Sequence, residues 1–327
     1  MAILPIRQNS SYVSNAVTTA DQFNLKRERC YILTVGDYSN GKGIKIDSRD
    51  YQRPLQITFN VDKSSDNKHN TGNSASIEIY NLSPDQEQML ESRFLEAELH
   101  VGYSNGEGLK LLAKGNLTEC STFKRGTDTI TQMIIGEGYV HLTQARLSQN
   151  LSPGQTVKDV IDTIVDNMPG VARGPIVGTN LNSHIIHGWR LSGTPKEELD
   201  KLTKAYNLEY NITNDTITVT DFNGPVSKST MNVPVISEET GMIDQPFRIT
   251  EKSRVSGKDK RARAGVQVKV LLDAGLTPSR VIKIEYKDYT GFYRISSIRF
   301  TGDFRGNEWY AELQCNDMQD SDITIIG

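Results

Sequence analysis

Two segments decide the fold of this 327-residue chain: Leu99-His100-Val101-Gly102-Tyr103 and Ile282-Lys283-Ile284-Glu285-Tyr286. In both, apolar or aromatic residues occupy every second position, which is the pattern of a half-buried β-strand. Each is followed, 18 to 20 residues later, by an aromatic-basic-glycine turn and a further alternating strand; the turns are Phe123-Lys124-Arg125-Gly126 and Phe304-Arg305-Gly306. The repeat predicts two equivalent β units. The alternative is that any two antiparallel sheets share such hairpins.

Short alternating segments surround both copies of the repeat and are separated by clusters of Gly, Asn, Asp and Ser. They include residues 31–33, 44–46, 57–61, 77–79, 266–270, 293–300 and 309–313. Only one helix is expected among the first strands, where Ser83 can cap and Pro84 suits the first helical turn. We expect the first β unit to end near Ser148.

Between about residues 150 and 222 the hydrophobic period changes from two to 3.6. One helix is predicted over 156–165, and Pro169-Gly170 ends it. A second begins at Thr194-Pro195-Lys196-Glu197, a capping box with proline at the first helical position. Residues 208–212 and 217–219 then alternate around the turn Asn214-Asp215, which predicts a hairpin. The segment is therefore expected to be a small α+β unit.

The predicted fold class is β-rich α+β, with two tube-like β-barrel units and a small α+β domain inserted between them. The predicted parts are an extended N-terminal arm (1–24), a first β-barrel unit (25–148), the α+β domain (149–224) and a second β-barrel unit (225–327). The arm is rich in Ser, Asn, Gln and Thr and has few periodic apolar positions. Gly224-Pro225 and residues 227–232 form the predicted linker to the second unit.

Composition narrows the possible functions. Charged residues make up 24% of the chain, the net charge is -3 and the pI is near 6.0, so nothing favours nucleic-acid or membrane binding by the chain as a whole. Apolar runs are at most four residues long, so we expect no membrane anchor and synthesis in the host cytoplasm. Cys30, Cys120 and Cys315 are far apart, which predicts three buried small side chains rather than disulfides or a zinc site.

The sequence contains no compact catalytic signature. It has no Gly-x-Ser-x-Gly, Walker loop, His-Glu-x-x-His motif or dinucleotide fingerprint. His184 and His187 are the nearest approach to a metal pair, but no helical register brings the rings together, so two unrelated loop histidines are expected. Glu238, Glu239 and Asp244 are expected at the solvated surface. We therefore expect no catalytic residues, no cofactor, no metal and no enzymatic activity.

A basic segment lies between residues 251 and 263. Its six cations face only Glu251 and Asp259, so the local charge is +4. One interpretation is a partner-docking loop for an acidic partner, a lipopolysaccharide or a nucleic acid, and the other is a solvated hairpin loop before the strand at Val266. The candidate docking residues are Lys252, Arg254, Lys258, Lys260, Arg261 and Arg263.

Several sequence segments, in their order along the chain, resemble the baseplate hub, or tail hub, proteins of contractile-tailed bacteriophages. The similar segments are residues 73–83, 199–219, 240–246, 265–272, 291–295 and 302–309, within a likeness that covers most of 29–316. The second of these resembles the family's leucine-bearing helix followed by a hairpin. Family members have more glycine-marked turns than residues 253–263 show, so the role of that loop stays open.

The resemblance implies a homotrimer in which each subunit supplies two tube-like barrels. Six quasi-equivalent barrels would face a hexameric tail tube, while threefold symmetry would suit a trimeric spike. The implied partners are the chain itself, the tail tube protein, the spike protein and baseplate wedge or tape-measure proteins. DNA would pass through a neutral or acidic lumen without specific binding, and the protein would be located in the tail baseplate of the virion.

Other functions remain open on the sequence. A tail-associated cell-wall hydrolase or glycan-binding module is suggested by the helical segment after Pro153-Gly154 and by candidate exposed Tyr and Trp residues. A secretion-system spike or a distal protein of a long flexible tail would keep the structural role.

Overall fold

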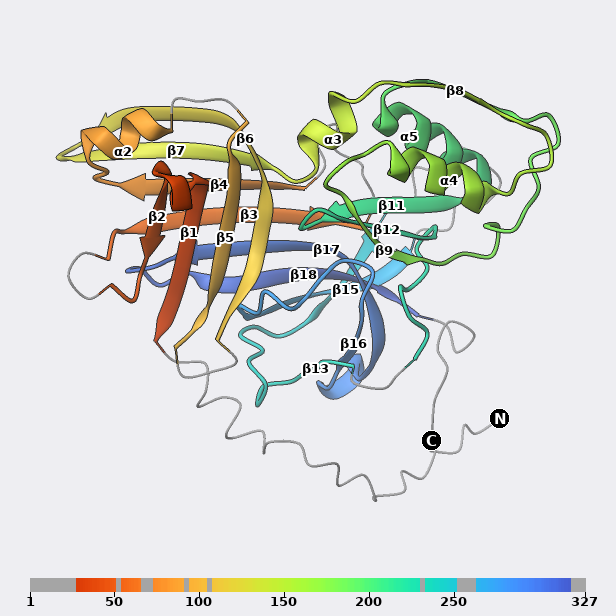
Figure 1. The fold of residues 1–327 in the computed structure, drawn as a ribbon. Helices are drawn as coiled ribbons and strands as arrows, with labels where there is room; N and C mark the ends of the chain where they lie inside the picture. Colours follow the sequence, from red (N-terminus) through yellow and green to blue (C-terminus); the bar gives the residue numbers. More distant parts are fainter. Residues whose placement is uncertain are drawn as a thin grey trace.

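A computed structural model describes residues 28–50, 54–65, 73–90, 94–104, 108–229, 233–251 and 263–318 (Figure 1). Its architecture is β-rich α+β, which confirms that part of the predicted fold class. The predicted N-terminal arm, residues 1–24, lies outside the described residues. None of the described helices is long and apolar enough to cross a membrane.

The N-terminal part of the chain is mostly strand, with α2 at the predicted position after Ser83, which caps it. Its elements are β1 (Arg29–Asp37), η1 (Tyr38–Asn40), β2 (Lys42–Asp47), β3 (Ile57–Ser64), β4 (Ser74–Tyr80), α2 (Pro84–Met89), β5 (Glu96–Tyr103), β6 (Gly108–Arg125), β7 (Asp128–Gly136) and α3 (Tyr139–Thr143).

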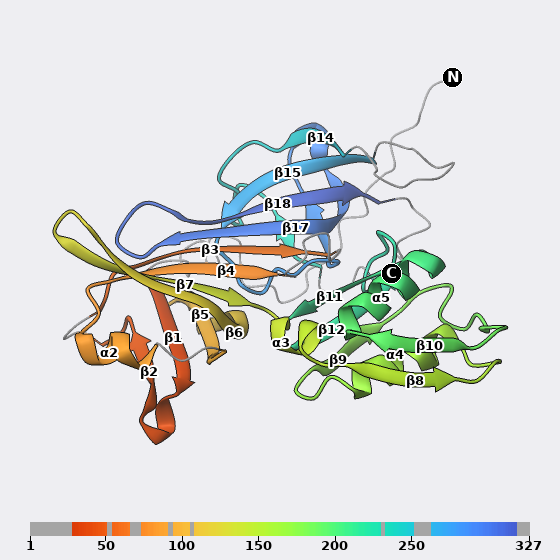
Figure 2. The ribbon, with the colours of Figure 1, turned by 90° about the horizontal axis from the view of Figure 1, so that it is seen from above.

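The C-terminal part is again mostly strand. It comprises β13 (Val235–Ile236), β14 (Phe247–Glu251), β15 (Arg263–Leu271), β16 (Val281–Ile284), η2 (Lys287–Tyr289), β17 (Gly291–Asp303) and β18 (Trp309–Asp317). Figure 2 shows β14, β15, β18, β17, β3, β4 and β7 side by side in one layer.

The two β units share one 13-stranded sheet. Its main path runs β14-β15-β18-β17-β3-β4-β7-β6-β5-β1-β2, and the antiparallel pair β17–β3 joins the two units. Two separate closed barrels were expected, and no closed barrel occurs among the described strands. The physical reason is that β17 uses one edge to pair with β3 across the boundary, where a closed barrel would need that edge for its own unit.

The core of the sheet is continuous across the two units. In Figure 1, β1, β2, β5 and the first half of β6 cross the strands β3 and β4, so two layers face each other. Inward residues alternate with outward ones, as in β3, where Ile57, Phe59 and Val61 are almost fully buried. One cluster of buried apolar side chains extends from Tyr31 to Cys315 and includes residues of both units.

The predicted repeat is present in the strand order. The paths β3-β4-β7-β6 and β14-β15-β18-β17 correspond strand by strand. Both long strands, β6 and β17, carry a bulge where they leave their first neighbour, at Thr118 and Ser296. The bulge hydroxyls make the same contact: Thr118 Oγ1 donates to the carbonyl of Ile134 at 3.0 Å, and Ser296 Oγ donates to that of Gln314 at 2.9 Å.

The bulges also fix the register of the repeat. Three residues before the bulge, Gly115 of β6 lies opposite Ala97 in the first copy, and Tyr293 of β17 lies opposite Ile282 in the second. Ala97 therefore corresponds to Ile282, so the sequence match of Leu99 with Ile282 is wrong by two residues. Hydrophobic alternation could not reveal this error, because shifting the alignment by two residues leaves every side chain on the same face of the sheet.

The inserted segment has a hydrophobic core of its own, formed by buried side chains between Leu142 and Val219. Both predicted helices and the predicted hairpin form. The elements are β8 (Leu147–Leu151), α4 (Val157–Asp166), β9 (Ala172–Ile176), β10 (Trp189–Gly193), α5 (Pro195–Tyr206), β11 (Leu208–Thr213) and β12 (Thr216–Asp221). Strands β11, β12 and β9 form one small sheet, and β10 and β8 form another.

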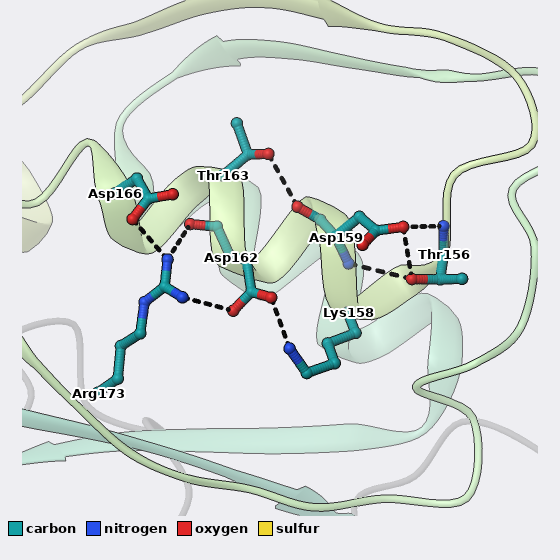
Figure 3. Close-up of polar contacts among 7 residues, drawn as sticks. All are labelled: Thr156, Lys158, Asp159, Asp162, Thr163, Asp166 and Arg173. Atoms are coloured by element: carbon teal, nitrogen blue, oxygen red, sulfur yellow. Dashed lines mark hydrogen bonds and ion pairs between the residues drawn. The ribbon is translucent and has the colours of Figure 1, made fainter.

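Local polar contacts fix both ends of α4 (Figure 3). At its start Thr156 and Asp159 form a reciprocal capping box, in which the Asp159 amide donates to Thr156 Oγ1 and the Thr156 amide donates to Asp159. Near its end Arg173 of β9 pairs with Asp162 and Asp166. These contacts satisfy free amides at the helix start and neutralise the carboxylates of Asp162 and Asp166.

The cysteines are only partly as expected. Cys30 and Cys315 are buried, and burial raises the pKa of both thiols. Cys120 is exposed, so its predicted burial is wrong. It lies in the second half of β6, where every residue from Glu119 to Arg125 is exposed.

Replacing the helix cap tests the local basis of α4. Thr156→Ala removes the side-chain acceptor of the capping box, so we expect the free energy of local opening of α4 to fall by about 1 kcal/mol. Amide hydrogen exchange of α4 measures the change. Thr163→Ala is the control, because Thr163 Oγ1 only donates to the Asp159 carbonyl in mid-helix. Equal effects of the two substitutions would contradict this account.

Candidate functional site

The seam between the two repeats is an antiparallel pair with specific side-chain contacts. Strand β17 pairs antiparallel with β3, from Ser297 opposite Ser64 to Asp303 opposite Thr58. On the outer face Thr301 Oγ1 lies 3.2 Å from Asn60 Oδ1, and Arg299 pairs with Asp62 at 2.7 Å. Cross-strand pairs of this kind stabilise a sheet and define its register.

The turn after β17 is docked on the first repeat. Arg29 of β1 donates to the carbonyls of Asp303, Gly306 and Asn307. The ring of Phe304 meets that of Tyr31 edge to face, with centroids 5.0 Å apart. The hairpin β17–β18 is therefore held by the neighbouring repeat at its edge and at its tip.

A buried ion pair ties the insert to the seam. The guanidinium of Arg294 in β17 contacts the carboxylate of Glu209 in β11, and both side chains are at least 95% buried. Arg294 also donates to the carbonyl of Gly224 at 2.7 Å and to the hydroxyls of Ser65 and Ser279. A buried pair is stable only when its remaining donors are also satisfied, and these contacts satisfy them.

A second buried pair lies on the neighbouring strand. Lys63 Nζ in β3 is 2.9 Å from Glu137 Oε1, just after β7, and both side chains are almost fully buried. Asn73 donates to Glu137 Oε2 and to the carbonyl of Ile212 in β11. Two charge networks on adjacent strands thus hold the insert against the sheet, and the three parts of the chain are fixed relative to one another.

Apart from β2 at the end of its path, the large sheet has two long stretches of edge with no strand beside them among the described residues. One is the outer edge of β14, and the other is the second half of β6, beyond the part that pairs with β5. Each carries an exposed aromatic side chain: Phe247 of β14 is 51% exposed and Phe123 of β6 is 36% exposed. Open edges with apolar side chains are sites of strand pairing with another chain.

A cavity of about 370 Å³ is lined by residues of both β units. Tyr103 at the end of β5, Ile236 of β13 and Leu272 contribute to its lining. Lys110 Nζ crosses between the units to Asp273 at 3.2 Å. Burial raises the pKa of the Tyr103 hydroxyl, so the hydroxyl stays protonated. These groups connect the two β units across the cavity.

The predicted docking loop lies almost entirely outside the described residues. Lys252, Arg254, Lys258, Lys260 and Arg261 lie outside the described residues, and the structure describes only the backbone of Arg263, which begins β15 opposite Glu251. Partner docking by this loop therefore stays a prediction.

The structure describes the histidines and the carboxylates that the sequence singled out. His184 Nδ1 contacts the carbonyl of Gly154 at 2.9 Å, while Glu238, Glu239 and Asp244 are exposed. No group of three or more His, Cys, Asp or Glu side chains that could hold a metal occurs within the described ranges.

The sequence interpretation missed both buried ion pairs. Lys63 could have been found, because it continues the inward alternation of Ile57, Phe59 and Val61. An unpaired charge cannot occupy a core position, so a lysine there requires a buried acid. Nothing in the local pattern identifies Glu137 or Glu209 as the partner, since those contacts span 74 and 85 residues of sequence.

Comparisons with known proteins identify the fold. No family model and no curated protein matches the chain. Among solved structures, the 43 kDa tail protein of prophage MuSo2 from Shewanella oneidensis is similar over 88% of this chain and 96% of its own length, with a TM-score of 0.59 and 11% identity. The tail protein from Neisseria meningitidis MC58 is similar over 90% and 98%, with a TM-score of 0.57 and 12% identity.

A third similar structure is the E. coli c3393 protein, a component of the type VI secretion system with structural similarity to the T4 tail proteins gp27 and gp5. It matches over 83% of this chain and 76% of its own length, with a TM-score of 0.56 and 12% identity. The chain therefore has the fold of phage tail proteins. The resemblance to tail hub proteins is confirmed at the level of the fold.

The buried pair at the seam gives a stability prediction. Glu209→Ala leaves the Arg294 guanidinium buried without its carboxylate, so we expect a loss of about 3–5 kcal/mol in the free energy of unfolding. Chemical denaturation measures it. Asp62→Ala is the control, because it removes a mostly exposed partner of Arg299 and should cost at most about 1 kcal/mol. Similar losses for both variants would show that the buried pair does not hold the insert.

Proposed function

We propose that this protein is the structural hub of a phage tail baseplate. In this proposal it is a homotrimer that joins the hexameric tail tube to the trimeric spike and lines the DNA channel. Its direct partners are other copies of itself, the tail tube protein, the spike protein and baseplate wedge or tape-measure proteins. It acts in the virion tail by geometry rather than by catalysis.

One observation carries the proposal: a single chain contains two equivalent β repeats joined edge to edge. Three such chains present six equivalent repeats while retaining threefold symmetry. That is the arrangement needed between a sixfold tube and a threefold spike. The fold shared with phage tail and secretion-system proteins supports the same role.

The proposal also explains why the predicted barrels are open in a single chain. Each repeat supplies part of a tube wall, and the wall closes only when the repeats of neighbouring copies meet. The β17–β3 pairing, with Lys63 and Arg294 of these strands both bound to the insert, then keeps the two repeats of one copy at a fixed angle. A ring of six units closes only if that angle is constant.

The proposal predicts a stable trimer. Mass photometry of the purified chain should give a species of about 110 kDa, three times 36.5 kDa, at nanomolar to micromolar concentration. Obligate interfaces leave little free monomer. Negative-stain electron microscopy of the same sample should show rings with a central channel. A chain that stays monomeric at micromolar concentration would overturn the proposed function.

A further inference from the structure

The two copies of the repeat differ in what surrounds their long hairpin. In the second copy, β17 pairs with β3 and the following turn is docked on β1. In the first copy, the equivalent half of β6 has no described strand beside it, and Glu119 to Arg125 are exposed on both faces. Figure 2 shows both hairpin turns at the same end of the sheet. One hairpin is therefore covered, and its equivalent is open.

Because the bulges align the two long strands, each residue of one hairpin can be matched to a residue of the other. Thr118 corresponds to Ser296, as their identical hydroxyl contacts show. Phe123 follows Thr118 by five residues, and Thr301 follows Ser296 by five. Phe123 therefore occupies in the first repeat the position that Thr301 occupies in the second.

The strand on the other side of the seam, β3, can be matched to β14 in the same way. Asn60 lies opposite Ser76, which lies opposite Ile134. In the second repeat, Phe247 lies opposite Gln267, which lies opposite Gln314. Since Ile134 and Gln314 correspond through the bulge contacts, Phe247 occupies the position of Asn60.

Thr301 and Asn60 touch across the internal seam, at 3.2 Å. Their equivalents, Phe123 and Phe247, are both exposed aromatics on strand edges that have no described neighbour, and they lie on different repeats. A contact between the same two positions in different copies would cover both rings. The open edges of β6 and β14 are the equivalents of the paired edges of β17 and β3 and can pair in the same geometry.

We propose that β6 of one copy pairs antiparallel with β14 of a second copy, in the register that sets Phe123 opposite Phe247. The inference rests on the proposed homotrimer and adds its interface. Three such junctions alternate with three internal β17–β3 seams and close a ring of six repeats. Each protomer then contributes β14-β15-β18-β17-β3-β4-β7-β6 to one continuous wall.

Disulfide cross-linking tests the register. Directly opposed residues in an antiparallel pair have Cβ atoms close enough for a disulfide. We expect Phe123→Cys with Phe247→Cys, in a Cys120→Ser background that removes the exposed native thiol, to give covalent dimers and trimers on non-reducing gels after mild oxidation. The matched control pairs Tyr38→Cys with Phe247→Cys; Tyr38 is 53% exposed but lies on η1. That control should stay uncrosslinked.

A charge pair gives an independent test that does not depend on oxidation. Phe123→Lys and Phe247→Asp should each raise at least tenfold the concentration at which half of the protein is trimeric, as measured by mass photometry. The double variant should recover most of that loss, because the opposite charges face each other across the junction. Absence of recovery would contradict the register.

The outcomes separate this inference from the proposed function. A wild-type trimer whose 123–247 cysteines link no better than the control would overturn the strand pairing and leave the trimer intact. A wild-type monomer would overturn both. Covalent trimers from the 123–247 pair alone, with recovery in the double charge variant, support the interface.

Discussion

The antiparallel pairing of β17 with β3 is the interaction on which the rest of the structure depends. It joins strands more than 220 residues apart in sequence and makes one sheet out of two repeats. The charged side chains of Arg294 and Lys63, on these two strands, reach buried carboxylates, one on the insert and one beside it. Because an uncompensated buried charge is costly, the seam and the insert are coupled.

The edge-to-edge joining of the two repeats leaves open edges in the sheet. The contact between the copies covers one edge of each repeat and leaves the equivalent edge of the other repeat open. An open edge exposes unpaired backbone groups, and natural proteins either block such edges or use them for assembly. Here both open edges carry an exposed aromatic side chain, Phe123 and Phe247, next to charged residues such as Lys124 and Arg248. The exposed rings favour assembly, as in the proposed hub.

Much of the fold could be predicted from residue patterns, because the patterns report local constraints. Alternation located most strands, and the capping residues Thr156 and Thr194 located the helices of the insert. The register of the repeat could not be read with the same accuracy, since side chains two apart share a face. Cys120 was misassigned for a related reason: the alternating pattern of β6 continues beyond the point where its layer ends.

The sequence by itself determined where most strands and the helices of the insert form, and that the chain holds two β units around an α+β insert. Those features depend on hydrophobic periodicity and capping, which act over a few residues. Only the tertiary structure decided that the units share one sheet, that Lys63 and Arg294 find carboxylates, and which edges stay open. Each of these depends on pairing between distant strands, and the free energy of such contacts belongs to the assembled sheet rather than to any single segment.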